Sequence, residues 1–218
     1  MSFVATTQTV YDKYKNNPIK SITINRSPVP KYITQVLGKL SSDSFTRELK
    51  QQPYDKLFHL YVDLGINGMT ILLEKNEVIM MIEGKRKSKD TESMKVNNIP
   101  ANLTLQQLIE NTKTRMGSRF FPYNASSNNC QDFILNLLNA NGINESEYNS
   151  FIKQDTSTLF KDKPYLRKFA NTTTDVAGVV NTRVQRTIDK GNKVKEMITN
   201  PINTVKEIIN NPKKILFI

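Results

Sequence analysis

The sequence predicts an α+β protein in which a small antiparallel sheet packs against a helix that begins at a cysteine. Apolar and polar residues alternate along residues 57–64, and a second such run follows a Gly-Ile-Asn-Gly segment, as in a β-hairpin. After Cys130, apolar residues recur every three to four positions, as in an amphipathic helix. We expect one domain over residues 18–170, with a flexible segment at 1–17 and a helical C-terminal extension over 171–218.

The N-terminal part is expected to add a strand and a helix to this core. Residues 1–17 are polar and predicted to be loosely attached, with a short helix near residues 9–15. Three isoleucines then predict a strand: Ile19, Ile22 and Ile24. Ser27-Pro28-Val29-Pro30 should end it. The apolar spacing predicts a helix over residues 31–40 that packs on the hairpin, followed by a polar connection over residues 41–53.

The predicted hairpin brings the only histidine of the chain close to a carboxylate. His59 lies on the polar face of the first strand. If residues 65–68 form the loop, His59 faces Glu74 directly. If only Asn67-Gly68 turns, Glu74 faces Tyr61, and the histidine is its diagonal neighbour on the same face. In either register the carboxylate can reach the imidazole.

Between the hairpin and the cysteine, three further elements are expected. Residues 78–82 predict a third antiparallel strand. Residues 84–96 form a charged segment that is typical of a solvated surface loop, with attraction of a substrate as the less common alternative. Residues 103–116 predict an amphipathic helix that ends at Gly117.

The stretch from Tyr123 to Leu138 contains the only cysteine of the chain. It consists of a loop, two asparagines that can cap a helix, and Cys130 in the first turn of an apolar helix that Gly142 can end. The unpaired amides and the dipole of a helix start stabilise a thiolate. A lone cysteine is nevertheless more often a small buried apolar residue. The interpretation as a nucleophile therefore depends on His59 as its base, with Glu74 as the group that orients the imidazole.

The same helix start can supply donors for an oxyanion. The candidates are the backbone amide of Cys130 and a side-chain amide from Asn128 or Asn129. Two asparagines before a helix are more often caps. Tyr123 could hydrogen-bond near the thiol, although packing is the commoner role. Further along, residues 144–147 resemble a capping box for another helix.

The order of these residues resembles a known family. A histidine in a strand, an acidic residue in the next strand and a later Asn-Cys that opens a helix resemble the circularly permuted papain-like fold of NlpC-type peptidases and lecithin retinol acyltransferase-like proteins. The segment NNCQDF is similar to the Asn-Cys-Glu-His-Phe signature of the acyltransferase branch. This segment departs from the signature at Gln131 and Asp132, which stand where the signature has Glu and His. Glu74 stands where those acyltransferases have a second histidine.

This resemblance covers residues 53–143 and has consequences for activity and location. FHLYVDL, LLEKNEVI and NNCQDF also resemble segments of uncharacterised proteins of large DNA viruses and their relatives. The resemblance implies a papain-like catalytic domain with Cys130, His59 and Glu74 in the catalytic roles. It also implies a virus-encoded protein of the host cytoplasm or the virion.

Composition narrows the classes of function. With one cysteine, neither an internal disulfide nor a zinc site with two or four cysteines can form. The sequence shows no metal-ligand cluster and no cofactor motif. A net charge of +11 favours phosphates or lipid headgroups in general, but no zinc finger or Gly-rich phosphate loop supports sequence-specific binding of nucleic acid. We expect no signal peptide and no transmembrane helix.

The C-terminal extension has a repeat of its own. VKEMITNP, starting at Val194, recurs as VKEIINNP from Val205, and eleven residues span three helical turns almost evenly. Residues 183–218 contain eight Lys or Arg and three Asp or Glu. Such a basic, amphipathic segment suits an anionic membrane surface or a partner such as a capsid protein. The alternative is that it packs along its own domain or a neighbouring subunit.

Together these patterns predict a cysteine peptidase or amidase, or an acyltransferase or phospholipase-like enzyme, that forms a thioester on Cys130. The substrate would be a peptide or a lipid. The alternative is a non-catalytic structural protein, such as a minor virion component, which uses the same scaffold and its C-terminal extension for docking.

Overall fold

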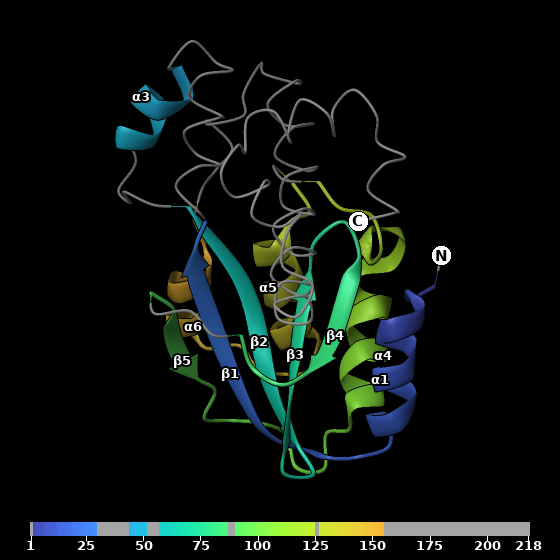
Figure 1. Cartoon of the computed structure of the whole chain (residues 1–218). Coiled ribbons are helices and arrows are strands. Elements are labelled where there is room, and N and C mark those ends of the chain that lie inside the picture. Colours follow the sequence, from blue (N-terminus) through green and yellow to red (C-terminus); the bar gives the residue numbers. More distant parts are fainter. Residues whose placement is uncertain (1, 30–43, 52–56, 87–89, 125–126, 155–218) are drawn as a thin grey trace, which may run out of the picture.

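The computed structural model describes residues 2–29, 44–51, 57–86, 90–124 and 127–154 (Figure 1). In chain order the elements are α1 (Ala5–Tyr14), β1 (Ile19–Pro28), α3 (Ser44–Lys50), β2 (Phe58–Ile66), β3 (Met69–Lys75), β4 (Ile79–Glu83), β5 (Glu92–Lys95), α4 (Leu105–Met116), η1 (Gly117–Arg119), α5 (Cys130–Ala140) and α6 (Ser146–Ile152). Within these residues, five strands form an antiparallel sheet in the order β4-β3-β2-β1-β5. The predicted α+β class is confirmed.

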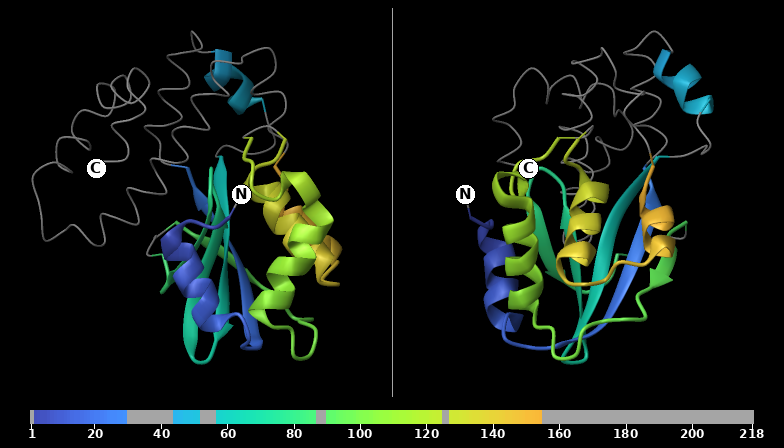
Figure 2. Two further views of the ribbon diagram at one scale, coloured as in Figure 1. Left: turned by 90° about the vertical axis from the view of Figure 1, so that its right-hand side faces the viewer. Right: turned by 180° about the vertical axis from the view of Figure 1, so that it is seen from behind.

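Helices α4 and α5 lie on one face of the sheet, and α1 packs beside β4 (Figure 2). Helix α5 contacts β2 and β3 directly, because its apolar side faces the apolar side of the hairpin. Residues from both layers form one core, which includes Ile22, Ile24, Leu60, Val62, Leu64, Ile71, Leu73, Leu108, Phe133, Ile134 and Leu137. No helix in the described part of the chain combines the length and apolar character needed to cross a bilayer.

The hairpin has the shorter of the two predicted turns. Asn67 and Gly68 adopt positive φ values of 50° and 74°, as a two-residue turn between twisted strands requires. Tyr61 is paired with Glu74, so the register with the Asn67-Gly68 turn is confirmed and the four-residue loop is wrong. Because alternate residues of a strand share a face, His59 and Tyr61 lie on the same side of β2.

The N-terminal segment is more closely attached than expected. The helix predicted near residues 9–15 is present but begins at Ala5, and it contacts β4. The buried hydroxyl of Thr7 donates to the carbonyl of Ile79 and accepts from the amide of Met81, both at 3.2 Å. These bonds to β4 tie α1 to the edge of the sheet.

Several expected elements differ in extent. Strand β1 continues through Ser27 and Pro28 rather than ending before them, and the connection over 41–53 contains helix α3. Strand β5 lies inside the segment 84–96 that was expected to be a loop. The capping box over 144–147 is wrong, because Glu145 precedes α6 without a side-chain cap. The helix predicted over 31–40 and the extension 171–218 lie outside the described residues.

Candidate active site

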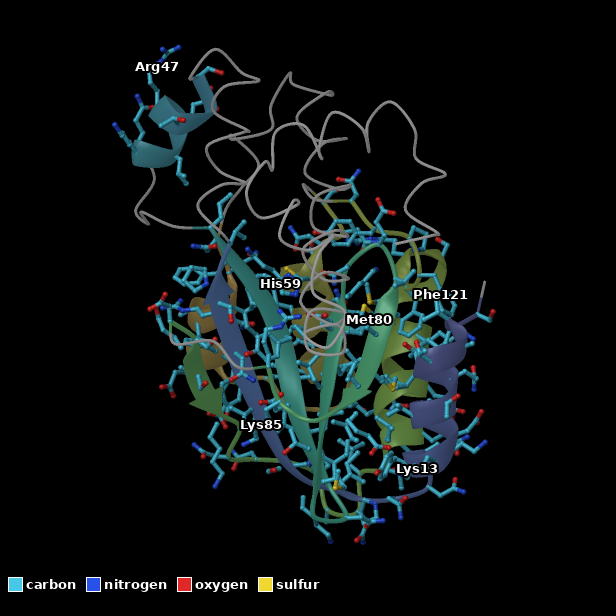
Figure 3. The ribbon with its side chains drawn as sticks, viewed as in Figure 1. Lys13, Arg47, His59, Met80, Lys85 and Phe121 are labelled. Carbon is cyan, nitrogen blue, oxygen red and sulfur yellow. The ribbon has the colours of Figure 1, made fainter. Side chains whose placement is uncertain are left out.

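The hairpin holds the imidazole of His59 against the carboxylate of Glu74. His59 Nε2 lies 2.7 Å from Glu74 Oε2, across the diagonal of the β2–β3 ladder. Figure 3 labels His59 within the sheet. A carboxylate at this distance accepts the Nε2 proton. The other ring nitrogen, Nδ1, is then the one that can exchange a proton with a nucleophile. The orienting role predicted for Glu74 therefore fits the observed geometry.

The sheet opens beside this pair. Strand β2 pairs with β3 from Tyr61 to Ile66, whereas His59 and Leu60 pair with β1. On the other side, Lys75 pairs with β4. Helix α5 is visible between the diverging ends of β2 and β3 in Figure 1. The β2–β3 ladder thus ends two residues beyond His59, and α5 packs against both strands.

Cys130, the first residue of α5, reaches His59 at this opening. The interaction with Cys130 favours the charged form of the imidazole. Burial by itself would lower the pKa of His59. The charge and hydrogen bond of Cys130, followed by those of Glu74, outweigh burial and raise this pKa from 6.5 to about 9. The structure thus brings together the three residues that the sequence singles out, in an arrangement suited to an imidazolium–thiolate pair.

Arg86 holds the other side of Glu74, and the sequence did not identify it. Its Nη2 lies 2.9 Å from Oε1 and 2.7 Å from Oε2 of the carboxylate, and its guanidinium stacks 4.8 Å from the ring centre of Tyr61. Burial would raise the pKa of Glu74, but the hydrogen bonds and charges of His59 and Arg86 together lower it. Arg86 lies in the segment expected to be a solvated loop, so that expectation is wrong for this residue.

Asn129 caps the helix that carries the nucleophile. Its side-chain oxygen accepts from the backbone amides of Gln131 and Asp132, and Asp132 Oδ2 accepts from the amide of Asn129 in return. This reciprocal pairing is a capping box, and it fixes the first turn of α5. Among the described residues, no acceptor is paired with the backbone N–H of Cys130. That amide therefore stays a candidate oxyanion donor.

Asn128 anchors the loop before the nucleophile. Its side-chain nitrogen donates to the carbonyls of Arg119 and Pro122, at 2.8 and 2.6 Å. Both amide hydrogens are used in these bonds, so this side chain has none left for an oxyanion. Tyr123 lies in the same loop and is half-buried. Its hydroxyl stays a predicted contact of the substrate.

Lys75 connects β3 to the loop that precedes Cys130. No pattern in the sequence singles out this lysine. It is fully buried, and its Nζ donates to the carbonyl of Arg119 at 3.0 Å. Burial, followed by the charge of Arg119, lowers the pKa of Lys75 to about 8, although Asp132 opposes the shift. Glu74 and Lys75 are neighbours in β3. Together they hold the histidine on one side of the sheet and the cysteine loop on the other.

The described residues contain no group of three or more His, Cys, Asp or Glu side chains that could hold a metal ion.

Comparisons of the chain with protein-family models, with curated proteins and with solved structures gave no match.

Proposed function

We propose that the protein is a cysteine-dependent hydrolase or acyltransferase that forms a thioester on Cys130. The observation that supports this most is the position of His59, which is hydrogen-bonded to Glu74 and whose pKa is raised by its interaction with Cys130. A nucleophile, a base and a group that orients the base are the parts that covalent acyl transfer requires.

In the first half-reaction, the thiolate of Cys130 attacks the carbonyl carbon of the substrate and forms a C–S bond. The carbonyl oxygen becomes an oxyanion, which the backbone N–H of Cys130 stabilises. His59, protonated at Nδ1, gives that proton to the leaving nitrogen or oxygen as its bond to carbon breaks. The enzyme is left as a thioester, with neutral His59 still hydrogen-bonded to Glu74.

In the second half-reaction, neutral His59 accepts a proton from water or from another acceptor. The activated oxygen or nitrogen attacks the thioester carbon, and Cys130 leaves as the thiolate. Water gives a hydrolase, and an acceptor alcohol or amine gives an acyltransferase. The imidazolium–thiolate pair is restored in either case.

The order of the catalytic residues supports a fold of the circularly permuted papain-like type. His59 and Glu74 come from consecutive strands, and Cys130 follows them at the start of a helix that packs on the same sheet. The proposed substrate is an amide or a lipid ester, because a thiolate attacks the carbonyl of both. The resemblance to viral proteins supports a role in the host cytoplasm or in the virion.

A cysteine-directed acyl-type probe would test this proposal. We expect it to label Cys130, and we expect His59→Ala to lower the labelling rate at neutral pH by at least about a hundredfold, the range for loss of a general base. Glu74→Gln should also lower the rate, whereas Glu77→Gln, an exposed carboxylate three residues later, should not. Equal labelling of the wild type and His59→Ala would contradict the proposal.

The substrate would then be identified by its products. Peptide and phospholipid libraries are incubated with the wild-type protein, and products are read by mass, with Cys130→Ala as the control. Peptide fragments or released fatty acids that require Cys130 would assign the bond.

A non-catalytic scaffold is the second candidate. The observation in its favour is burial: Cys130 is only 6% exposed, and Glu74 is fully enclosed. In a scaffold these side chains would stabilise the fold without meeting a substrate. An absence of probe labelling at Cys130 under native conditions, together with labelling after unfolding, would favour this candidate.

A further inference from the structure

Gln154 connects the two segments that carry the candidate catalytic pair, strand β2 and helix α5. Its side-chain oxygen accepts from the backbone amide of Phe58 at 3.0 Å. Its own backbone amide donates to the side-chain oxygen of Gln131 at 2.8 Å. Phe58 immediately precedes His59, and Gln131 immediately follows Cys130. One residue therefore bridges the neighbours of the base and of the nucleophile.

This bridge lies beyond the end of the β2–β3 ladder. The β2–β3 ladder ends at Tyr61, so the first residues of β2 have no partner on the β3 side. Buried backbone amides need acceptors, and Gln154 supplies one for Phe58. Gln131 is itself only 6% exposed, so its amide is held inside the protein. The bridge thus replaces ladder bonds at the position where helix α5 enters the opening.

A second set of contacts holds the bridging residue in place. Arg26, on β1, donates to the carbonyl of Phe151 at 3.1 Å, near the end of α6. The same guanidinium stacks between two rings, 4.9 Å from the centre of Phe58 and 4.4 Å from that of Phe151. These contacts join the end of α6 to the start of β2 independently of Gln154. The bonds of Gln154 and the contacts of Arg26 therefore both hold the end of α6 against the start of β2.

We propose that Gln154 and Gln131 are positioning residues that set the distance between His59 and Cys130. This inference rests on the proposed function, because it matters only if the imidazole activates the thiol. Neither side chain needs to touch the substrate. Their effect passes through Phe58 to the histidine and through the first turn of α5 to the cysteine, where small displacements have large effects on rate.

The rate of alkylation of Cys130 by iodoacetamide in the full-length protein, at pH 6 and at pH 9.5, tests the assignment. A thiol paired with an imidazolium is ionised at pH 6, whereas an isolated thiol ionises only near pH 8.5. We expect Gln154→Met and Gln131→Met each to lower the rate at pH 6 about tenfold and to leave the rate at pH 9.5 within about twofold. The double variant should resemble the single ones, because both side chains act through one bridge.

Two further variants act as controls. Gln154→Glu keeps an oxygen acceptor for the amide of Phe58, so it should retain most of the rate at pH 6. Gln106→Met makes the same change on α4, where the glutamine side chain bonds to exposed Glu110, and should match the wild type at both pH values. If the alkylation rate at pH 6 fell as much in Gln154→Glu as in Gln154→Met, the role of the acceptor oxygen would be overturned.

The result for His59→Ala separates the two proposals. If alkylation of Cys130 at pH 6 is slower in this variant but not in Gln154→Met and Gln131→Met, the positioning role is wrong and the proposed function stands. If wild-type Cys130 reacts at pH 6 no faster than His59→Ala, the proposed function fails, and the positioning role fails with it. If the alkylation rate of Gln154→Met and Gln131→Met fell at both pH values, this would indicate a general loss of structure and would also overturn the assignment.

Discussion

The carboxylate of Glu74 is shared by His59 and Arg86. It is fully buried, and the side chain of Arg86 is only 13% exposed. A buried carboxylate that loses one of its cations keeps the full cost of its desolvation. Arg86 therefore stabilises the folded state and also limits how much of the negative charge of Glu74 acts on the imidazole.

Replacing Arg86 should destabilise the protein strongly. We expect Arg86→Met to lower the free energy of unfolding by about 3 kcal/mol, as for one half of a buried ion pair. The control is Lys13→Met, which breaks a well-exposed pair with Glu83 and should change stability far less. Urea unfolding of both variants gives the comparison. Similar losses in the two variants would contradict the buried pairing of Arg86.

The raised pKa of His59 predicts that stability falls at alkaline pH. Its folded-state pKa is about 9, against 6.5 for the ordinary side chain, so its contribution is complete below pH 6.5 and is lost as the pH rises through 9. Between pH 6.5 and 8 the unfolding free energy should fall by about 2 kcal/mol. Above pH 8, buried Lys75 deprotonates in the folded state and offsets part of the fall.

Urea unfolding of the wild type and of His59→Ala at pH 6.5 and 8 would measure this contribution. The variant should show a much flatter dependence, because it lacks the titrating imidazole. If the unfolding free energy fell by the same amount in both proteins, the pH dependence would belong to other groups.

At the scale of the helix, the cap of α5 should affect both stability and reactivity. Asn129→Ala removes the side chain that accepts from two amides of the first turn, and such changes cost about 1 kcal/mol. The start of the helix should then fray, and the alkylation rate of Cys130 near pH 6 should fall because the thiol loses its fixed position beside His59.

Helix α4 provides the matched control. Thr104 forms the same kind of capping box with Gln107, so Thr104→Ala should cost a similar amount of stability. That helix carries no candidate catalytic residue, and the rate at Cys130 should not change. Equal loss of rate in both variants would show that reactivity follows global stability rather than the local cap.

The sequence predicted the elements whose signals are local. The turn at Asn67-Gly68 and the start of α5 at Cys130 follow from residue preferences that act over a few positions. Strand β5 was missed because its four residues are mostly exposed and do not alternate. Its position next to β1 comes from pairing across nearly seventy residues, which no local pattern encodes.

The same distinction explains which site residues could be predicted. His59, Glu74 and Cys130 are conspicuous by residue type and by their positions in predicted elements. Arg86 and Gln154 have no such signal, because their roles arise only when distant segments meet: Arg86 packs over the face of the β2–β3 hairpin, and Gln154 lies between β2 and α5.

At the scale of the whole molecule, the positive charge is unevenly distributed. The described residues contain fourteen Lys or Arg and twelve Asp or Glu, a net charge of +2. Nine of the eleven net positive charges of the chain therefore lie outside them. Attraction to anionic surfaces should consequently depend on the remaining segments, of which residues 183–218 are the most basic long one.

We therefore expect residues 183–218 to mediate binding to anionic membranes. A full-length variant with the eight Lys and Arg of this segment changed to Gln should lose most of its binding to phosphatidylserine-containing vesicles, since each basic residue near such a surface contributes about 1 kcal/mol. Wild-type binding should weaken with added salt and be absent with phosphatidylcholine alone. Co-sedimentation measures both. If the wild type does not bind phosphatidylserine vesicles at low salt, the segment serves a protein partner or its own domain instead.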